Sequence, residues 1–240
     1  MNIKQLQWIV GCLIVVTSGS LWGMGLRSFA ALPLEEKGIV FRLVDNESLD
    51  DNRNTLVTEF AYGLSGAQTL LFGIPYRLSP SGKHRTGDVS LLYRHMVWQQ
   101  NFKAGTHRLA LLGGGLIPTN KTSDGGAQVG FVATFYRNRH ELDLDGLWMP
   151  GFGQSRNQAL FDVSWQYRLW PLVYPATGLG SELNSVLEYN GRQQEGEHLI
   201  HQTTLGLQWI HPTWVLEGGL VKDINAPYET QLIVSVRFHI

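Results

Sequence analysis

The stretch Phe161-Asp162-Val163-Ser164-Trp165-Gln166-Tyr167-Arg168 alternates strictly between two kinds of side chain. Its odd positions are aromatic or branched, and its even positions are an acid, a hydroxyl, an amide and a guanidinium. Successive side chains of a β-strand point to opposite sides of the sheet, so a strand of this sequence has one apolar face and one polar face. Both faces cannot meet the same solvent, and this alternation is typical of transmembrane β-barrel strands.

Segments with this kind of alternation, each about ten residues long, recur along most of the chain. We expect strands at 54–64, 68–77, 87–99, 106–117, 127–137, 140–148, 157–168, 181–191, 199–210, 213–222 and 229–240, with a possible further strand at 38–44. Single-chain bacterial barrels have even strand counts, which favours twelve over eleven. The sequence therefore predicts an all-β protein, a transmembrane antiparallel up-and-down β-barrel of about 12 strands.

The connections between these segments largely alternate in length. Long ones at 45–53, 78–86, 118–126 and 149–156 alternate with tight ones such as 65–67, 138–139 and 211–212. Such barrels carry tight turns at one end and longer loops at the other. The connection 169–180 breaks this rule, which predicts either an extra loop at the short-turn end or a slip in our register.

Composition agrees with a barrel and excludes some classes of function. Charged residues are 16% of the chain, aromatics are 11%, and there are 27 glycines, while a mean hydropathy of −0.09 leaves a soluble β-protein open. The formal net charge of −1 gives no electrostatic attraction for nucleic acid. We found no dinucleotide loop, phosphate loop or zinc-ligand spacing.

Residues 1–30 resemble a secretory signal peptide. Lys4 precedes an apolar core at 8–16, and Ser28-Phe29-Ala30 resembles a cleavage site, so we expect cleavage after Ala30. A retained membrane anchor is the alternative, but the strongly apolar part is too short to span a bilayer. We divide the rest into a stretch at 31–53, with the possible first strand and an acidic loop, and a barrel at 54–240. Whether 31–53 plugs the barrel stays open.

One face of the expected strands is apolar and free of charge, as in Leu70, Phe72, Ile74 and Tyr76. An Arg or Lys on that face near the bilayer midplane would cost about 2 to 4 kcal/mol, so this face suits outer-membrane lipid. Many Trp and Tyr residues lie near strand ends, as aromatic girdles require.

The opposite, inward face carries the candidate solute path. Its polar and charged members are Glu59, Arg94, Glu141, Asp143, Asp145, Asp162, Gln166, Arg168, Glu182, Glu188, Gln202, Gln208, Glu217 and Arg237. Acids outnumber bases in this set. Two interpretations stay open: a cation-favouring lumen or polar binding site, and a neutralised network of salt bridges that fills a narrow barrel.

Several motifs resemble those of a known family. They are Tyr62-Gly63-Leu64-Ser65, Gly73-Ile74-Pro75-Tyr76, Gly87-Asp88-Val89, Leu116-Ile117-Pro118-Thr119 and Leu187-Glu188-Tyr189-Asn190-Gly191. In order and spacing they resemble the MetA-pathway of phenol degradation family of outer-membrane transporters, over roughly residues 54–240. The resemblance implies a barrel in the outer membrane of a Gram-negative bacterium that transports small compounds, often hydrophobic or aromatic. No catalytic residues come with it.

Two functions other than transport are alternatives for a barrel of this kind. An outer-membrane lipid hydrolase needs a Ser and a His within hydrogen-bond reach, and the nearest pattern is His201-Gln202-Thr203, without a Ser. We therefore expect no enzyme, no cofactor and no metal site. A structural barrel with a filled lumen is the second rival. The partners expected for a channel are membrane lipid, a small-molecule solute and, through the C-terminal strand, the barrel-insertion machinery.

Overall fold

The computed structural model describes residues 25–240 except 122, 174–179 and 226. Its strands are β1 (Ile39–Ser48), β2 (Asn54–Ser65), β3 (Gln68–Ser79), β4 (Val89–Phe102), β5 (Gly105–Ile117), β6 (Gly126–Arg137), β7 (His140–Met149), β8 (Gln158–Trp170), β9 (Glu182–Gln194), β10 (Ile200–His211), β11 (Trp214–Asp223) and β12 (Thr230–His239). None of the described residues forms a helix long and apolar enough to cross a bilayer.

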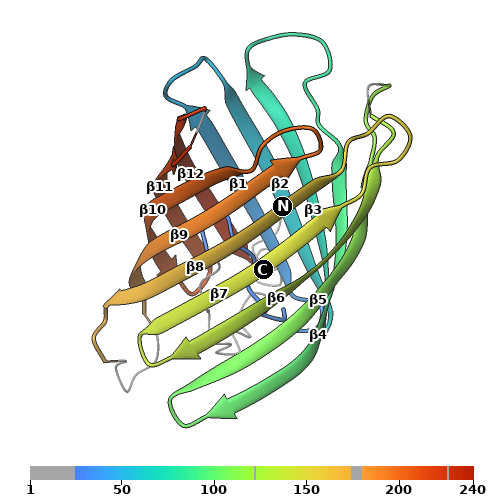
Figure 1. Cartoon of the computed structure of the whole chain (residues 1–240). Coiled ribbons are helices and arrows are strands. Elements are labelled where there is room, and N and C mark those ends of the chain that lie inside the picture. The colour runs from blue at the N-terminus through green and yellow to red at the C-terminus, as the bar shows by residue number, and fades with distance from the viewer. Residues whose placement is uncertain (1–24, 122, 174–179, 226) are drawn as a thin grey trace, which may run out of the picture.

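The strands form one closed antiparallel barrel in which each strand pairs with its neighbours in sequence (Figure 1). The sheet is closed by β1, which pairs with β12 on one side and β2 on the other. The prediction of twelve strands is therefore confirmed, and the possible strand at 38–44 is real. The barrel wall begins at Ile39 rather than at residue 54, because β1 extends through Asp45 and Glu47 into the stretch we expected to be an acidic loop.

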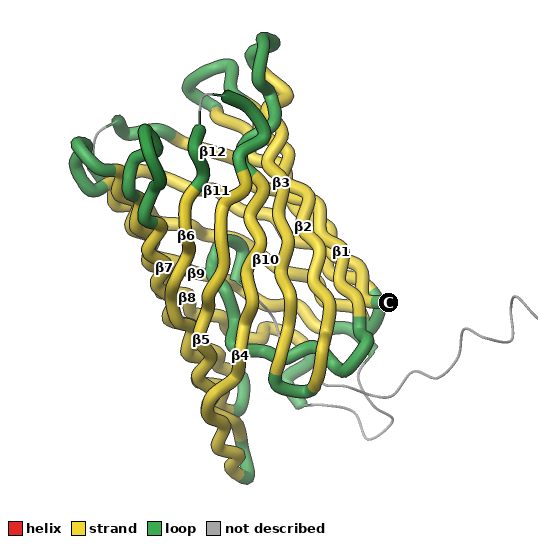
Figure 2. The backbone as a smooth tube through the Cα atoms, turned by 90° about the vertical axis from the view of Figure 1, so that its right-hand side faces the viewer, coloured by secondary structure: helices red, strands yellow, loops and turns green. Residues whose placement is uncertain are grey.

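The longer loops gather at one end of the barrel, and four of the five connections at the other end are tight turns of two residues (Figure 2). The exception is the connection between β8 and β9, at residues 171–181. Strand pairing is in register from Gln158 to Arg168, with Gln166 opposite Val186 and Asp162 opposite Asn190, and one irregularity lies next to the loop, between Arg168 and Trp170. The long connection is thus an extra loop at the short-turn end, and the expected alternation of facing holds through Arg168.

The outer surface of the wall is apolar. Phe72, Val129, Phe131 and Val234, all expected to face lipid, are between 36% and 50% exposed. Rings cluster next to the tight turns, with centroids 4.9 to 5.2 Å apart: His107 packs edge-on against Phe135, His140 is tilted against Tyr167, and His211 stacks on Trp214. This arrangement resembles the aromatic girdle of a membrane barrel.

The interior is mixed, with polar side chains buried beside two small apolar clusters. One apolar cluster contains Leu92, Ala110, Leu112, Val132, Leu147 and Met149 together with Ala31, and the other contains Val44, Val186, Val221 and Ile233 together with Leu26. Leu26 and Ala31 precede the first strand. The stretch from Leu26 to Ala31 therefore lies inside the barrel.

Candidate functional site in the barrel lumen

The sequence-predicted path residues lie on the inner side of the wall. All of them except Glu59 are buried, in a protein whose alternate strand positions are exposed and apolar. Glu59, on β2, has a side chain that is 41% exposed and contacts the buried Arg42 at 3.3 Å. Two regions on different parts of the wall contain six residues of this set. One contains Glu217, Gln208 and Arg237, and the other contains Asp143, Asp145 and Glu188.

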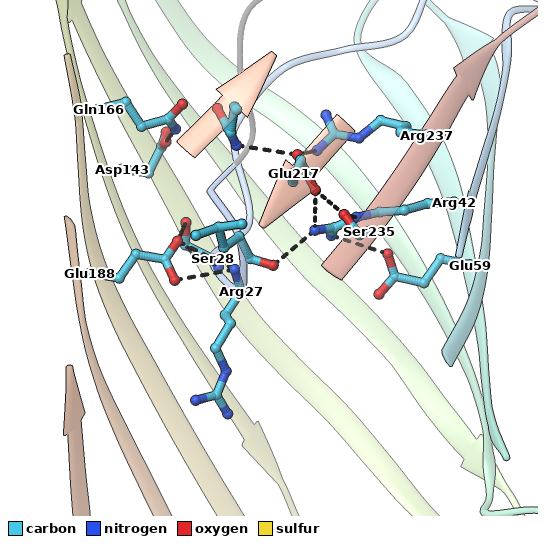
Figure 3. Close-up of polar contacts among 12 residues, drawn as sticks. Arg27, Ser28, Arg42, Glu59, Asp143, Gln166, Glu188, Glu217, Ser235 and Arg237 are labelled. Atoms are coloured by element: carbon cyan, nitrogen blue, oxygen red, sulfur yellow. Dashed lines mark hydrogen bonds and ion pairs between the residues drawn. The ribbon is translucent and has the colours of Figure 1, made fainter. Parts of the chain in front are cut away.

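The first region, which we call the Glu217 cluster, consists of Glu217, Arg42, Arg237, Ser235 and Gln208. Arg42 donates a hydrogen bond to Glu217 at 2.6 Å, and both Arg237 and Ser235 also donate to this carboxylate (Figure 3). Gln208 Nε2 donates to it at 3.2 Å. A buried carboxylate with two guanidinium partners is well compensated, and the cluster joins β1, β10, β11 and β12 across the seam where the barrel closes.

The second region, which we call the acidic wall, consists of Asp143 and Asp145 on β7 and Glu188 on β9. Each of these residues is at most 3% exposed. The ion pairs found among the described residues involve none of the three. Asp143 accepts hydrogen bonds from Thr134 Oγ1 at 2.5 Å and Gln166 Nε2 at 3.0 Å. The donors to Asp143 are therefore neutral side chains of the wall, whereas the donors to Glu217 include two arginines.

Asp162 lies beside the acidic wall but is compensated by its neighbours. Arg192 forms a two-point contact with its carboxylate, at 2.7 and 3.2 Å, and Asn190 donates to it at 2.7 Å. The donors to Asp143 are both from the wall, whereas Asp145 and Glu188 have partners from elsewhere in the chain.

Those partners belong to residues 25–34, which we call the N-terminal segment. The Arg27 N–H donates to both oxygens of Glu188 at 3.3 and 3.2 Å, and Ser28 donates to the same carboxylate through its N–H and its hydroxyl at 3.5 and 3.2 Å (Figure 3). The Phe29 N–H donates to Asp145 at 2.9 Å. The Ala31 N–H donates at 2.8 Å to Thr134, which in turn donates to Asp143.

The carbonyls of the same segment are held by wall arginines. Arg42 Nη2 donates to the Leu26 carbonyl at 2.8 Å, and Arg94 Nη1 donates to the Ala30 carbonyl at 2.7 Å. Further along, the Leu34 N–H reaches Thr69 at 3.5 Å. The wall thus supplies acceptors to the N–H groups and donors to the carbonyls of a segment whose main chain bends at residues 26–28.

Two glycines make room for the segment. Gly206 on β10 and Gly219 on β11 are register partners, and a Cβ on either would lie 2.4 or 2.9 Å from Leu26 Cδ1. Gly219 therefore leaves space for a side chain inside the lumen.

Sequence reasoning missed the most central base. Arg42 was not in the inward set, although Val40, Arg42 and Val44 alternate in the possible first strand and all three are buried. That alternation could have identified it. Arg27 and Ser28 were missed because they lie in the stretch assigned to a signal peptide. Of that stretch, residues 1–24 lie outside the described residues, and residues 25–30 lie in the lumen.

Among the described residues, no group of three His, Cys, Asp or Glu side chains is arranged to hold a metal ion.

Comparisons with known proteins place the fold. The structure resembles that of an outer-membrane channel from Pseudomonas putida F1, with a TM-score of 0.57 and 16% identity over 88% of this chain and 98% of that one. It also resembles the KdgM porin, solved with disordered oligogalacturonate, with a TM-score of 0.51 and 9% identity over 84% of this chain and 98% of the porin.

No family model and no curated protein matches the sequence. The resemblance to the MetA-pathway family therefore stays a prediction. The comparisons show that this chain shares the closed antiparallel fold of outer-membrane barrels.

Proposed function

We propose that this protein is an outer-membrane channel for small solutes and that its inward polar residues form the path. The main support is one contrast within the wall, which is apolar outside and acidic and polar inside, on a fold shared with a channel and a porin. Lipid can contact the outer face without desolvating a charge, and a solute can exchange its hydration for polar contacts on the inner face. No chemical step is part of the proposal.

The proposed route to the membrane has three parts. A signal peptide at 1–30 directs the chain across the inner membrane of a Gram-negative bacterium and is cleaved after Ala30. The insertion machinery then recognises the C-terminal strand, β12, in which Phe238 is 42% exposed on the outer face. The barrel spans the outer membrane with its tight turns in the periplasm.

The acidic wall gives the proposed channel a preference for cations. Asp143, Asp145 and Glu188 place carboxylates in the lumen with no arginine in ion-pair contact within the described part of the chain. A pore lined by one sign of charge concentrates counter-ions of the other sign.

The test is single-channel recording of the refolded chain from Ala31 in a planar bilayer. We expect steady conductance with cation selectivity, and we expect the combined Asp143→Asn and Asp145→Asn variant to lower the cation-to-anion permeability ratio several-fold. Glu197→Gln, which alters an exposed carboxylate paired with Arg156 outside the lumen, should leave the ratio unchanged.

A structural barrel with a filled lumen is the second candidate, favoured by the N-terminal segment and the Glu217 cluster, which both occupy interior space. A silent bilayer with a correctly folded barrel would support that candidate and overturn the channel. Selective conductance that ignored the two aspartates would keep the channel but overturn the assigned path.

A further inference from the structure

The N-terminal segment is bound in the way that a protein binds a peptide. Its contacts to the wall combine N–H donors matched with carboxylates or a hydroxyl, and carbonyls matched with arginines. Main-chain recognition with pockets for side chains is a general mode of peptide binding. The wall therefore recognises main-chain groups, and residues 25–34 of this chain are one example of such a ligand.

Side chains of the segment are recognised as well. Leu26 packs with Val44, Val186, Val221 and Ile233, over the two glycines described above. Arg27 extends its guanidinium to Gln202 Oε1 at 2.6 Å. The lumen thus offers an apolar pocket beside a position for a basic group, with Glu188 between them holding the main chain.

Further polar atoms at this place have no partner in the structure. Asp145 Oδ1 and Ser164 Oγ are buried without a hydrogen bond, in residues that are 3% and 0% exposed. Ser164 Oγ lies beside Gly25, since a Cβ on that glycine would be 2.8 Å from it. A buried polar atom without a partner is costly, so these atoms leave capacity for a ligand with more donors than the segment provides.

We propose that the acidic wall, together with Arg42 and Arg94, is a binding site for short peptides that carry a basic side chain, and that such peptides are a solute class of this channel. The inference rests on the proposed channel function. It also uses the expected cleavage after Ala30, which removes residues 26–30 and vacates their contacts with Glu188, Asp145, Arg42 and Arg94. The vacated site then accepts a free peptide of the same chemistry.

This solute class differs from the one that the family resemblance implies. A hydrophobic or aromatic compound could fill the pocket of Leu26 but would leave Glu188 and Asp145 buried without donors, which is unfavourable for a charged group. A peptide of the proposed kind fills the pocket with an apolar side chain and donates its main-chain N–H groups to the carboxylates, while its basic side chain reaches Gln202.

The test uses two chains, one beginning at Ala31 and one beginning at Gly25, both refolded in detergent. Each retains all twelve strands, and the longer one also retains its own segment in the lumen. The probe is the peptide Leu-Arg-Ser-Phe-Ala, the sequence of residues 26–30, with acetyl and amide ends. A scrambled peptide of the same composition is the matched control, and binding is measured by titration calorimetry.

We expect saturable binding of the probe to the chain from Ala31 and at least about tenfold weaker binding to the chain from Gly25, whose site is already occupied. Glu188→Gln in the shorter chain should weaken binding at least about tenfold, because it removes the charge from an acceptor of several hydrogen bonds. Glu197→Gln should bind as the parent does. Absence of saturable binding to the chain from Ala31, equal binding of the scrambled peptide, or an unchanged affinity in Glu188→Gln would each overturn the peptide site.

Conductance of the same preparations separates the two proposals. A conducting barrel that does not bind the probe keeps the channel and overturns the peptide inference. A barrel that binds the probe but stays silent overturns the channel and, with it, the role of the peptide as a transported solute. Current that falls as the probe saturates its site supports both.

Discussion

The two charged regions of the lumen use the same residue types in opposite ways. In the Glu217 cluster, a carboxylate is compensated by two arginines of the wall itself. In the acidic wall, carboxylates are compensated by neutral donors of the wall and by N–H groups of the N-terminal segment. The Glu217 carboxylate takes its donors from the wall, whereas Glu188 and Asp145 take donors from the segment in the lumen. Arg42 takes part in both regions, because it donates to Glu217 and to the Leu26 carbonyl. The difference separates a carboxylate that is paired within the wall from carboxylates that are available to a ligand.

The largest effect that follows from this comparison concerns Glu217. Glu217→Gln leaves Arg42 and Arg237 buried without their shared carboxylate, and loss of one partner of a buried ion pair costs about 3 to 5 kcal/mol. We expect the free energy of unfolding in lipid vesicles to fall by that amount, measured as a shift in the urea midpoint by tryptophan fluorescence. A decrease in the free energy of unfolding of less than about 1 kcal/mol would contradict the structural role assigned to the Glu217 cluster.

Glu188 provides the contrasting substitution. In the chain from Ala31, Glu188→Gln removes a lumen charge whose donors from residues 27 and 28 are already gone. We expect the free energy of unfolding to stay the same or to rise by about 1 kcal/mol, because a carboxylate without an ion-pair partner, near the like-charged Asp143, contributes no stabilising contact. A loss of stability comparable to that of Glu217→Gln would mean that the acidic wall is structural.

The smallest effect is expected for an exposed ion pair. Arg156 and Glu197 are 2.9 Å apart, with side chains 56% and 50% exposed. Pairs of this kind contribute about 0 to 1 kcal/mol, so Glu197→Gln should barely move the urea midpoint. The same variant serves as a reference for the two buried carboxylates, and a large shift would show that the assay reports changes other than loss of buried contacts.

The alternation of side chains predicted the wall well. It located the strands, their number and the facing of residues such as Asp162 and Phe72, because period-two alternation is a local property of each segment. It could not predict which charges meet. Glu217, Arg42 and Arg237 come together only through the closing pairs of β1 with β12 and of β12 with β11, and no local pattern encodes which distant strands become neighbours.

The N-terminal segment was beyond sequence reasoning for a different reason. Residues 25–30 have the composition of a signal-peptide end, and that interpretation concerns processing rather than contacts. Their place in the lumen depends on the shape of the assembled interior, including the space beside Gly206 and Gly219. A segment of this length has no side-chain periodicity from which its position inside the barrel could be predicted.

The seam between β1 and β12 also imposes an order in time on assembly. The main chains of Ile39 and Ile240 exchange two hydrogen bonds of 2.9 Å, so the start of the wall is completed only by the end of the twelfth strand. Contacts between such distant residues are slow to form, because a long loop must close before they contribute. The Glu217 cluster lies at that seam, so its buried charges are fully paired only after β1 and β12 have closed the barrel. A chain truncated before β12 would lack Arg237 and Ser235, and closure and neutralisation would fail together.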